Sequence, residues 1–426
     1  MIGSVAQNVI NVTDTAFLGR LGDVALGGGA IGGLFYLAII MLGWGVGIGS
    51  QIIIARRFGE GENKKISAII EHTQYLLLIL AVALVILFEC FGKDILYHIV
   101  KSDNVFDASY SFLRYRIWGL FFAFPYFAYR AFYVGIGKTK VITYTTITMV
   151  LVNVFFGYSL IFGHFGFTRM GVSGAGLASV IAEFFGTIAF IIYTIFNKHV
   201  KQYKLFHISG YDSALMSRLF NVSLPLMLQN FFSFSVWFVF FLIIEKMGEV
   251  ELAVSNIIRS VYVVLLIPIM GFSTAANTLV SFVIGQGRSR EVLSLTWRIA
   301  LISGGFSAVL SIICSLFPRL ILQIYTTDQS IVTMALPLMH IITIASILLA
   351  IASAIFNAVS GTGKTNISLF LEVGILVIYI FSAFAFAILL NQPLAIVWTV
   401  EIIYGVLLAI ISFIYLRSNH WVGKKI

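Results

Sequence analysis

The string Gly135-Ile-Gly-Lys-Thr139 returns 226 residues later (361 minus 135) as Gly361-Thr-Gly-Lys-Thr365. The same offset, without a gap, relates other glycines: Gly22 to Gly248, Gly45 to Gly271, Gly59 to Gly285 and Gly61 to Gly287. Glycine is needed where the backbone takes a positive φ or where helices approach closely. The chain is therefore predicted to contain two copies of one structural unit.

The composition places these copies in a membrane. Of 426 residues, 60% are hydrophobic and only 11% are charged, and the mean hydropathy is +1.00. An ordinary soluble domain carries roughly 25% charged residues. A soluble fold of this length would lack the charge to cover its surface, which excludes globular, disordered, collagenous and disulfide-scaffold classes. The net charge of +9 fits basic cytoplasmic loops better than a nucleic-acid partner, and none is expected.

Apolar runs long enough to cross a bilayer as helices predict an all-α integral membrane protein with twelve transmembrane helices. Their expected bounds are 1–18, 27–55, 66–90, 108–134, 141–163, 171–196, 214–243, 251–284, 292–317, 331–359, 367–390 and 394–416. Six helices per copy is an even number, so both copies enter the membrane in the same orientation. This parallel repeat is typical of secondary transporters.

The domain boundary is predicted at the polar stretch 197–213, a cytoplasmic linker between an N-lobe (1–196) and a C-lobe (214–426). The offset places the counterparts of Ser213 and Pro225 before Met1. We therefore expect the first helix to lack its opening turns, through a misassigned start or truncation.

Basic residues predict the orientation. Of 27 Lys and Arg, 16 fall in or within a few residues of loops after even-numbered helices or in the C-terminal tail, and 6 fall in loops after odd-numbered helices. Because cytoplasmic loops collect Lys and Arg, both termini are expected in the cytoplasm of a multi-pass inner-membrane protein. No cleavable signal peptide is visible.

A polar stripe marks the first helix. Gln7, Asn11 and Asp14 fall at positions i, i+4 and i+7, on one helix face. Their counterparts in the second copy are Ser233, Trp237 and Phe240. Because ionisable groups within the membrane are costly, Asp14 is a functional candidate of the N-lobe alone. The alternative is a helix-end carboxylate that reaches water near Arg20.

Several segments together resemble multidrug and toxic compound extrusion (MATE) transporters over nearly the whole chain. They are Thr13-Asp-Thr-Ala-Phe-Leu-Gly-Arg-Leu-Gly22, Gln51 to Gly61, Gly135 to Lys140, Asn153 to Gly163, Gly171 to Ser179, Ile267-Pro-Ile-Met-Gly-Phe272 and Gly285-Gln-Gly287. The resemblance implies two six-helix lobes that export organic, often cationic, compounds against entry of Na⁺ or H⁺. It implies no cofactor beyond that coupling ion.

The resemblance also implies an ion-coupling site. Asp14 stands where the family has its ion-binding Asp, Asn153 resembles the family's ion-site Asn, and Ser179 matches a position that often carries a hydroxyl. These oxygen ligands suit Na⁺, held at Asp14 and Asn153, or relay of a proton through water. The alternative is that Asn153 and Ser179 only hydrogen-bond neighbouring helices.

One position departs from the family pattern. Many members carry a second Asp four residues after the Asn, where this chain has Gly157. Glu183, one turn along from Ser179, is a candidate for the second carboxylate. Paired carboxylates repel each other, which favours protonation of one and suits proton exchange. The alternative for Glu183 is a structural hydrogen bond to a neighbouring helix.

Other members carry their cation site in the C-lobe, on a Glu and an Asp. Ser233 and Leu349 occupy those places here, so that site is expected to be absent. Glu372 and Glu401 remain as C-lobe acids, and structural pairing is expected for them, with Arg259 as a partner of one.

Four aromatic residues are candidates for lining the substrate cleft, where rings hold flat cations: Tyr36, Tyr126, Tyr129 and Trp237. The expected partners are a small organic substrate and membrane lipid, and a monomer is expected.

The runner-up function is a flippase for lipid-linked saccharides, which would need a basic cavity built from Arg114, Arg116, Arg130 and Arg259. A channel is disfavoured because no filter-like loop is present, and an enzyme because no nucleophile–base or metal set is found.

Overall fold

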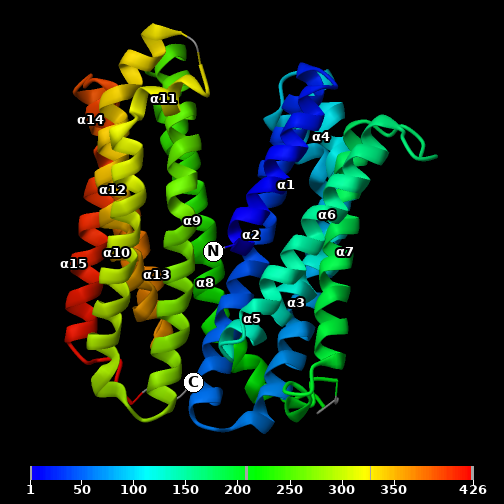
Figure 1. The fold of residues 1–426 in the computed structure, drawn as a ribbon, viewed down its shortest axis with the longest axis vertical. Coiled ribbons are helices and arrows are strands. Elements are labelled where there is room, and N and C mark those ends of the chain that lie inside the picture. The colour runs from blue at the N-terminus through cyan, green and yellow to red at the C-terminus, as the bar shows by residue number, and fades with distance from the viewer. Residues whose placement is uncertain (1, 207–209, 327, 424–426) are drawn as a thin grey trace. The chain divides into compact units, whose positions relative to one another are not determined.

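The computed structural model describes residues 2–206, 210–326 and 328–423, with the side chains of residues 2–9 and 11 left outside the description (Figure 1). The chain forms two compact units, Met1–Met227 (unit 1) and Leu228–Ile426 (unit 2). Helices make up both units, and the described residues contain no strand.

The helices follow one another through short turns. In unit 1 they are α1 (Ile2–Gly19), α2 (Asp23–Gly59), α3 (Asn63–Ile99), α4 (Asp103–Arg116), η1 (Ile117–Gly119), α5 (Leu120–Gly135), α6 (Lys140–Phe162), α7 (Val172–Phe196) and η2 (Lys201–Tyr203). α8 (Ser213–Glu245) leads into unit 2, which contains α9 (Glu249–Gly285), η3 (Ser289–Glu291), α10 (Val292–Leu316), α11 (Pro318–Gln323), α12 (Gln329–Gly361), α13 (Thr365–Phe384), η4 (Ala385–Leu389), α14 (Leu394–Trp398) and α15 (Val400–Arg417).

Ten helical segments in the described part are long and apolar enough to cross a membrane. The other two predicted spans are α1, which carries Gln7, Asn11 and Asp14 within 18 residues, and the α4–η1–α5 element. α4 and α5 have 14 and 16 residues, and η1 joins them into one long helical segment. The predicted fold class, twelve transmembrane helices in two lobes, is confirmed.

The duplication is visible in the helix ends. α2 and α9 both have 37 residues and begin 226 positions apart, at Asp23 and Glu249. Glycines at equivalent turns take left-handed backbone angles, with φ of 75° and 74° at Gly61 and Gly287 and 72° and 85° at Gly137 and Gly363. Side chains with a Cβ rarely adopt these angles. These four repeated glycines therefore mark helix-to-helix turns.

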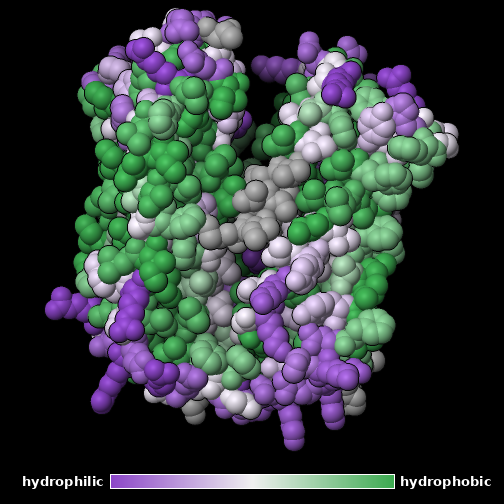
Figure 2. Space-filling view, in the orientation of Figure 1, coloured by the Kyte–Doolittle hydropathy of each residue, from purple (hydrophilic) through white to green (hydrophobic). Residues whose placement is uncertain are grey.

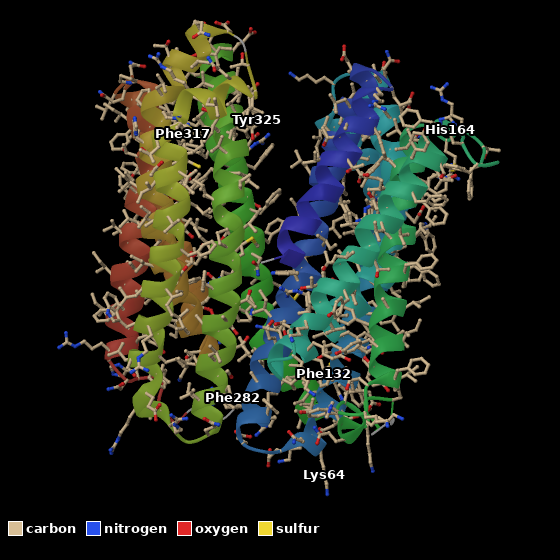
Figure 3. The ribbon with its side chains drawn as sticks, viewed as in Figure 1. Lys64, Phe132, His164, Phe282, Phe317 and Tyr325 are labelled. Carbon is tan, nitrogen blue, oxygen red and sulfur yellow. The ribbon has the colours of Figure 1, made fainter. Side chains whose placement is uncertain are left out.

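Each unit has an apolar middle and polar ends. Figure 2 shows apolar surface along the length of each unit, with hydrophilic residues gathered at the two ends. Within unit 1, Lys64 and Phe132 lie towards one end and His164 at the other, and within unit 2, Phe282 lies opposite Phe317 and Tyr325 (Figure 3). Successive loops thus alternate between the two ends, as membrane-crossing helices require.

The first turns of α8 pack within unit 1. A Cβ on Gly45 of α2 would lie 2.5 Å from the backbone N and Cα of Met227, and one on Gly49 would lie 2.9 Å from Cα of Ser223. The Gly-Xaa3-Gly spacing therefore lets α8 approach α2 closely. The compact units divide inside α8, whereas the boundaries drawn from the sequence, 1–196, 197–213 and 214–426, stay a prediction.

This close packing gives a test on one helix. Gly45→Ala should lower the apparent melting temperature in detergent, because overpacking costs about 1–3 kcal/mol. Gly33→Ala, also in α2, is the matched control, since a Cβ there meets nothing within 4 Å. Equal melting temperatures for the two variants would contradict the packing role of Gly45.

Candidate ion-coupling site

Three predicted site residues meet inside unit 1. The Ser179 hydroxyl on α7 donates to Oδ2 of Asp14 on α1 at 3.5 Å. The amide nitrogen of Asn153, on α6, donates to Ser179 Oγ at 3.3 Å. α6 packs against both α1 and α7, which brings the three side chains together. The side chains of Gln7 and Asn11 lie outside the described residues.

Two buried oxygens of the site have no hydrogen-bond partner among the residues that the structure describes, Oδ1 of Asp14 and Oδ1 of Asn153. Asn153 itself is fully buried. Buried polar atoms are nearly always partnered, so each exception requires an explanation. A carboxylate oxygen and an amide oxygen beside a fixed hydroxyl can receive a cation or, at the carboxylate, a proton.

Gly157 of α6 faces the ring of Phe17. A Cβ at Gly157 would lie 3.4 Å from this ring, which also packs edge-on against Phe162. Phe17 therefore covers the face of α6 where many family members carry their second Asp.

Glu183 forms an ion pair with Arg116 of α4. Arg116 Nη1 donates to Oε2 at 2.7 Å and Nη2 to Oε1 at 2.6 Å, a bidentate geometry that is typical of strong pairs. The Tyr36 hydroxyl lies 3.4 Å from both carboxylate oxygens, and its ring supports the guanidinium at 3.7 Å. A Cβ at Gly119 would lie 2.5 Å from Oε2, so glycine there leaves room for the pair.

This ion pair determines the charge of the site. Arg116 also interacts electrostatically with Asp14, but its two hydrogen bonds are made to Glu183. Two carboxylates and one guanidinium leave one negative charge when both acids are ionised. Because an uncompensated buried charge is costly, the Asp14 position favours one proton or one monovalent cation.

In the described part of unit 2, the positions equivalent to Asp14 and Asn153 carry aromatic residues. Continuing the 226 offset, Asp14 corresponds to Phe240 and Asn153 to Tyr379. The rings of Phe240 and Tyr379 lie 5.6 Å apart, and Phe240 is fully buried. Aromatic rings therefore occupy the place that the polar cluster has in unit 1.

The C-lobe acids bind hydroxyl groups instead of Arg259. Glu401 accepts hydrogen bonds from Tyr379 at 2.7 Å and Tyr262 at 3.1 Å. The Arg259 guanidinium lies 5.1 Å above the Phe241 ring. No ion pair joins Arg259 to Glu372 or Glu401 in the described part of the chain, so the pairing expected from the sequence was wrong.

The candidate cleft residues lie in varied surroundings. Tyr126 and Tyr129 pack their rings against Phe190 at 4.9 and 6.0 Å in the interior of unit 1, and Tyr36 belongs to the ion pair described above. Trp237 is half-buried and meets Phe241 edge-on at 5.4 Å. Their role in a substrate cleft stays a prediction.

Long apolar helices, a duplicated lobe and a carboxylate without its own counter-ion inside unit 1 are the features of a multi-pass membrane transporter. The MatE family profile matches residues 1–159 and 225–390. The chain therefore belongs to this family, the MATE multidrug efflux transporters, which are not enzymes. The resemblance inferred from the sequence is confirmed.

Curated relatives agree with this assignment. The chain is 26% identical over 364 residues to the probable multidrug resistance protein NorM of Thermotoga maritima, covering 85% of this chain and 78% of the relative. It is 26% identical over 382 residues to the probable multidrug resistance protein YoeA of Bacillus subtilis, covering 87% of this chain and 81% of the relative. The flippase alternative is not favoured.

Solved structures share the fold. A MOP superfamily transporter from Pyrococcus furiosus matches with a TM-score of 0.90 at 19% identity, covering 98% of this chain and 93% of that one. An outward-facing multidrug resistance MATE family transporter matches with a TM-score of 0.89 at 21% identity and the same coverage.

The ion pair predicts a stability effect. Arg116→Met should destabilise unit 1 by about 3–5 kcal/mol, because it leaves the buried Glu183 carboxylate unpaired. Adding Glu183→Gln should recover much of the loss. Arg114→Met, on the same helix and exposed, should change the apparent melting temperature little. A double variant no more stable than Arg116→Met alone would show that the pair does not carry the effect.

Proposed function

We propose that this protein is a secondary antiporter that exports organic, cationic or amphiphilic compounds in exchange for H⁺ or Na⁺ bound at Asp14. The observation that carries the proposal is the Asp14 carboxylate, whose Oδ1 is buried without a partner beside the Ser179–Asn153 hydrogen bond. Names of the relatives as multidrug resistance proteins support organic compounds as substrates.

The mechanism follows from the charge balance. With Glu183 neutralised by Arg116, binding of one proton or cation at Asp14 removes the remaining negative charge. Asp14, Asn153 and Ser179 belong to α1, α6 and α7, so occupancy changes the forces between these three helices. An ion that binds one helix arrangement better than another shifts the population towards it. Substrate binding is then coupled to the ion through that shift.

The two candidate ions make different demands. A proton needs only one oxygen of Asp14. Na⁺ needs several oxygen ligands, and Asp14, Asn153 and Ser179 would require additional ones from water or from the polar stripe of α1. The site can serve either ion, and transport under separate gradients distinguishes them.

The location proposed is the inner membrane, with both termini in the cytoplasm. The support is the unequal distribution of basic residues, 16 in or beside loops on one side and 6 on the other. A monomer is proposed as the working unit, with lipid around it.

The central test is Asp14→Asn in proteoliposomes that contain a fluorescent organic cation. Ion-driven efflux should be lost while the protein elutes as a folded species, because the amide cannot bind a proton or supply the charge. Asp23→Asn, an exposed acid at the start of α2, should transport normally. Undiminished efflux by Asp14→Asn would refute the role of Asp14.

The coupling ion is decided by imposing Na⁺ and pH gradients separately on the same vesicles. Proton coupling predicts efflux driven by the pH gradient without Na⁺, and Na⁺ coupling predicts the converse. In either case Asp14→Asn should abolish the efflux that the effective gradient drives in the wild type. Efflux that needs neither gradient would contradict antiport.

A further inference from the structure

A second buried carboxylate lies in unit 2, at Glu372 of α13, which is 2% exposed. Its Oε1 accepts hydrogen bonds from Ser233 of α8 and from the Tyr404 hydroxyl of α15, both at 2.7 Å. Its Oε2 is buried and has no hydrogen-bond partner among the described residues. Three helices thus hold one oxygen of this group firmly, while the other oxygen meets no donor.

Among the described residues, no Lys, Arg or His side chain forms an ion pair with Glu372. Besides Tyr404, the charged and titratable groups on the helices around it are Arg218 and Glu245 of α8, Glu249, Glu251, Arg259 and Tyr262 of α9, His340 of α12, Tyr379 of α13, Glu401, Tyr415 and Arg417 of α15, and Lys364 just before α13. Arg218, the one cation of α8, lies 15 residues before Ser233. Lys364 lies eight residues earlier, about 12 Å along the helix axis, and His340 is exposed and contacts Ser315. Arg417 lies 13 residues beyond Tyr404, about 20 Å along α15. Arg259 lies over Phe241.

The contrast with Glu183 shows what is missing. In unit 1 the buried Glu183 is neutralised by Arg116. The 226 offset takes Arg116 to Ile342, which is fully buried in the apolar core of unit 2. Unit 2 therefore has no arginine at this position for either of its buried glutamates, Glu401, the counterpart of Glu183, or Glu372. Burying a carboxylate without a countercharge costs several kcal/mol. Ser233 and Tyr404 are neutral donors, so they do not remove that charge.

We propose that Glu372, held by Ser233 and Tyr404, is a proton-binding site of unit 2, distinct from the Asp14 site, and that its proton exchanges during transport. The proton resides on Oε2, the oxygen that accepts no hydrogen bond. A metal cation is disfavoured because it would need further oxygen ligands around Oε2, whereas a proton needs only that atom.

The geometry gives this proton a mechanical consequence. Loss of the proton would leave an anion that Ser233 and Tyr404 cannot neutralise, so water would have to reach Oε2. Water can enter only if α8, α13 or α15 separate locally. The protonation state of Glu372 is thereby linked to the packing of these three helices. This inference rests on the proposed function for its statement that transport moves a proton.

The protonation itself is tested by infrared difference spectroscopy on the full-length protein in lipid at near-neutral pH. The carbonyl-stretch band of a neutral carboxylic acid should be present in the wild type and should be diminished in Glu372→Gln. Glu291→Gln is the control, because this exposed carboxylate is paired with Arg288 and lies in neither site, so its removal should leave that band unchanged. Tyr404→Phe removes one hydrogen bond to Oε1 and should shift the band, which keeps the test decisive if Glu372→Gln fails to fold.

Exchange during transport is tested by efflux. Glu372→Gln, permanently neutral, should lower efflux driven by a pH gradient by roughly 10-fold, within the usual range of coupling between sites. Absence of a neutral-acid band at Glu372 would overturn the site, and unchanged efflux would overturn its exchange. Asp14→Asn reports separately: lost efflux there, with no neutral acid at Glu372, would leave the proposed function standing and this inference refuted.

Discussion

The bidentate contact between Arg116 and Glu183 is the interaction on which the chemistry of unit 1 depends. Within a bundle of apolar helices each ionised group must meet an opposite charge or become neutral. Because there is one guanidinium for two acids, the charge of Glu183 is neutralised by Arg116 and the negative charge of Asp14 remains. The pair therefore leaves Asp14 as the one carboxylate of this site that still needs a proton or a cation.

The two units share one contact around a buried glutamate. Tyr36 and its counterpart Tyr262 each donate to a buried glutamate, Glu183 in unit 1 and Glu401 in unit 2. The surrounding positions differ: a second tyrosine, Tyr379, takes up the other oxygen of Glu401, whereas Asn153 occupies the corresponding position in unit 1. The tyrosine–glutamate contact is common to both units, whereas within the described residues an arginine pairs with the glutamate only in unit 1.

Glycine has two separate uses in this fold. At the helix-to-helix turns it permits left-handed backbone angles, as at Gly137 and Gly363. Within helices it removes the Cβ that would keep elements apart, as at Gly45 against α8 and at Gly119 beside the ion pair. The first use preserves the repeat, since both copies need the same turns. The second use differs between positions, since it depends on which neighbour approaches.

The sequence by itself determined the membrane fold, the twelve helices, the duplication and the family, because hydropathy, glycine spacing and motif order are properties of the chain taken in order. It also identified Asp14, Asn153 and Ser179 as a group, although through resemblance rather than through spacing. Only the tertiary structure decided the partners of the buried acids. Arg116 and Glu183 are 67 positions apart, as Glu372 and Ser233 are 139 apart. No periodicity links such residues, since side-chain pairing between distant helices depends on how the helices rotate and pack.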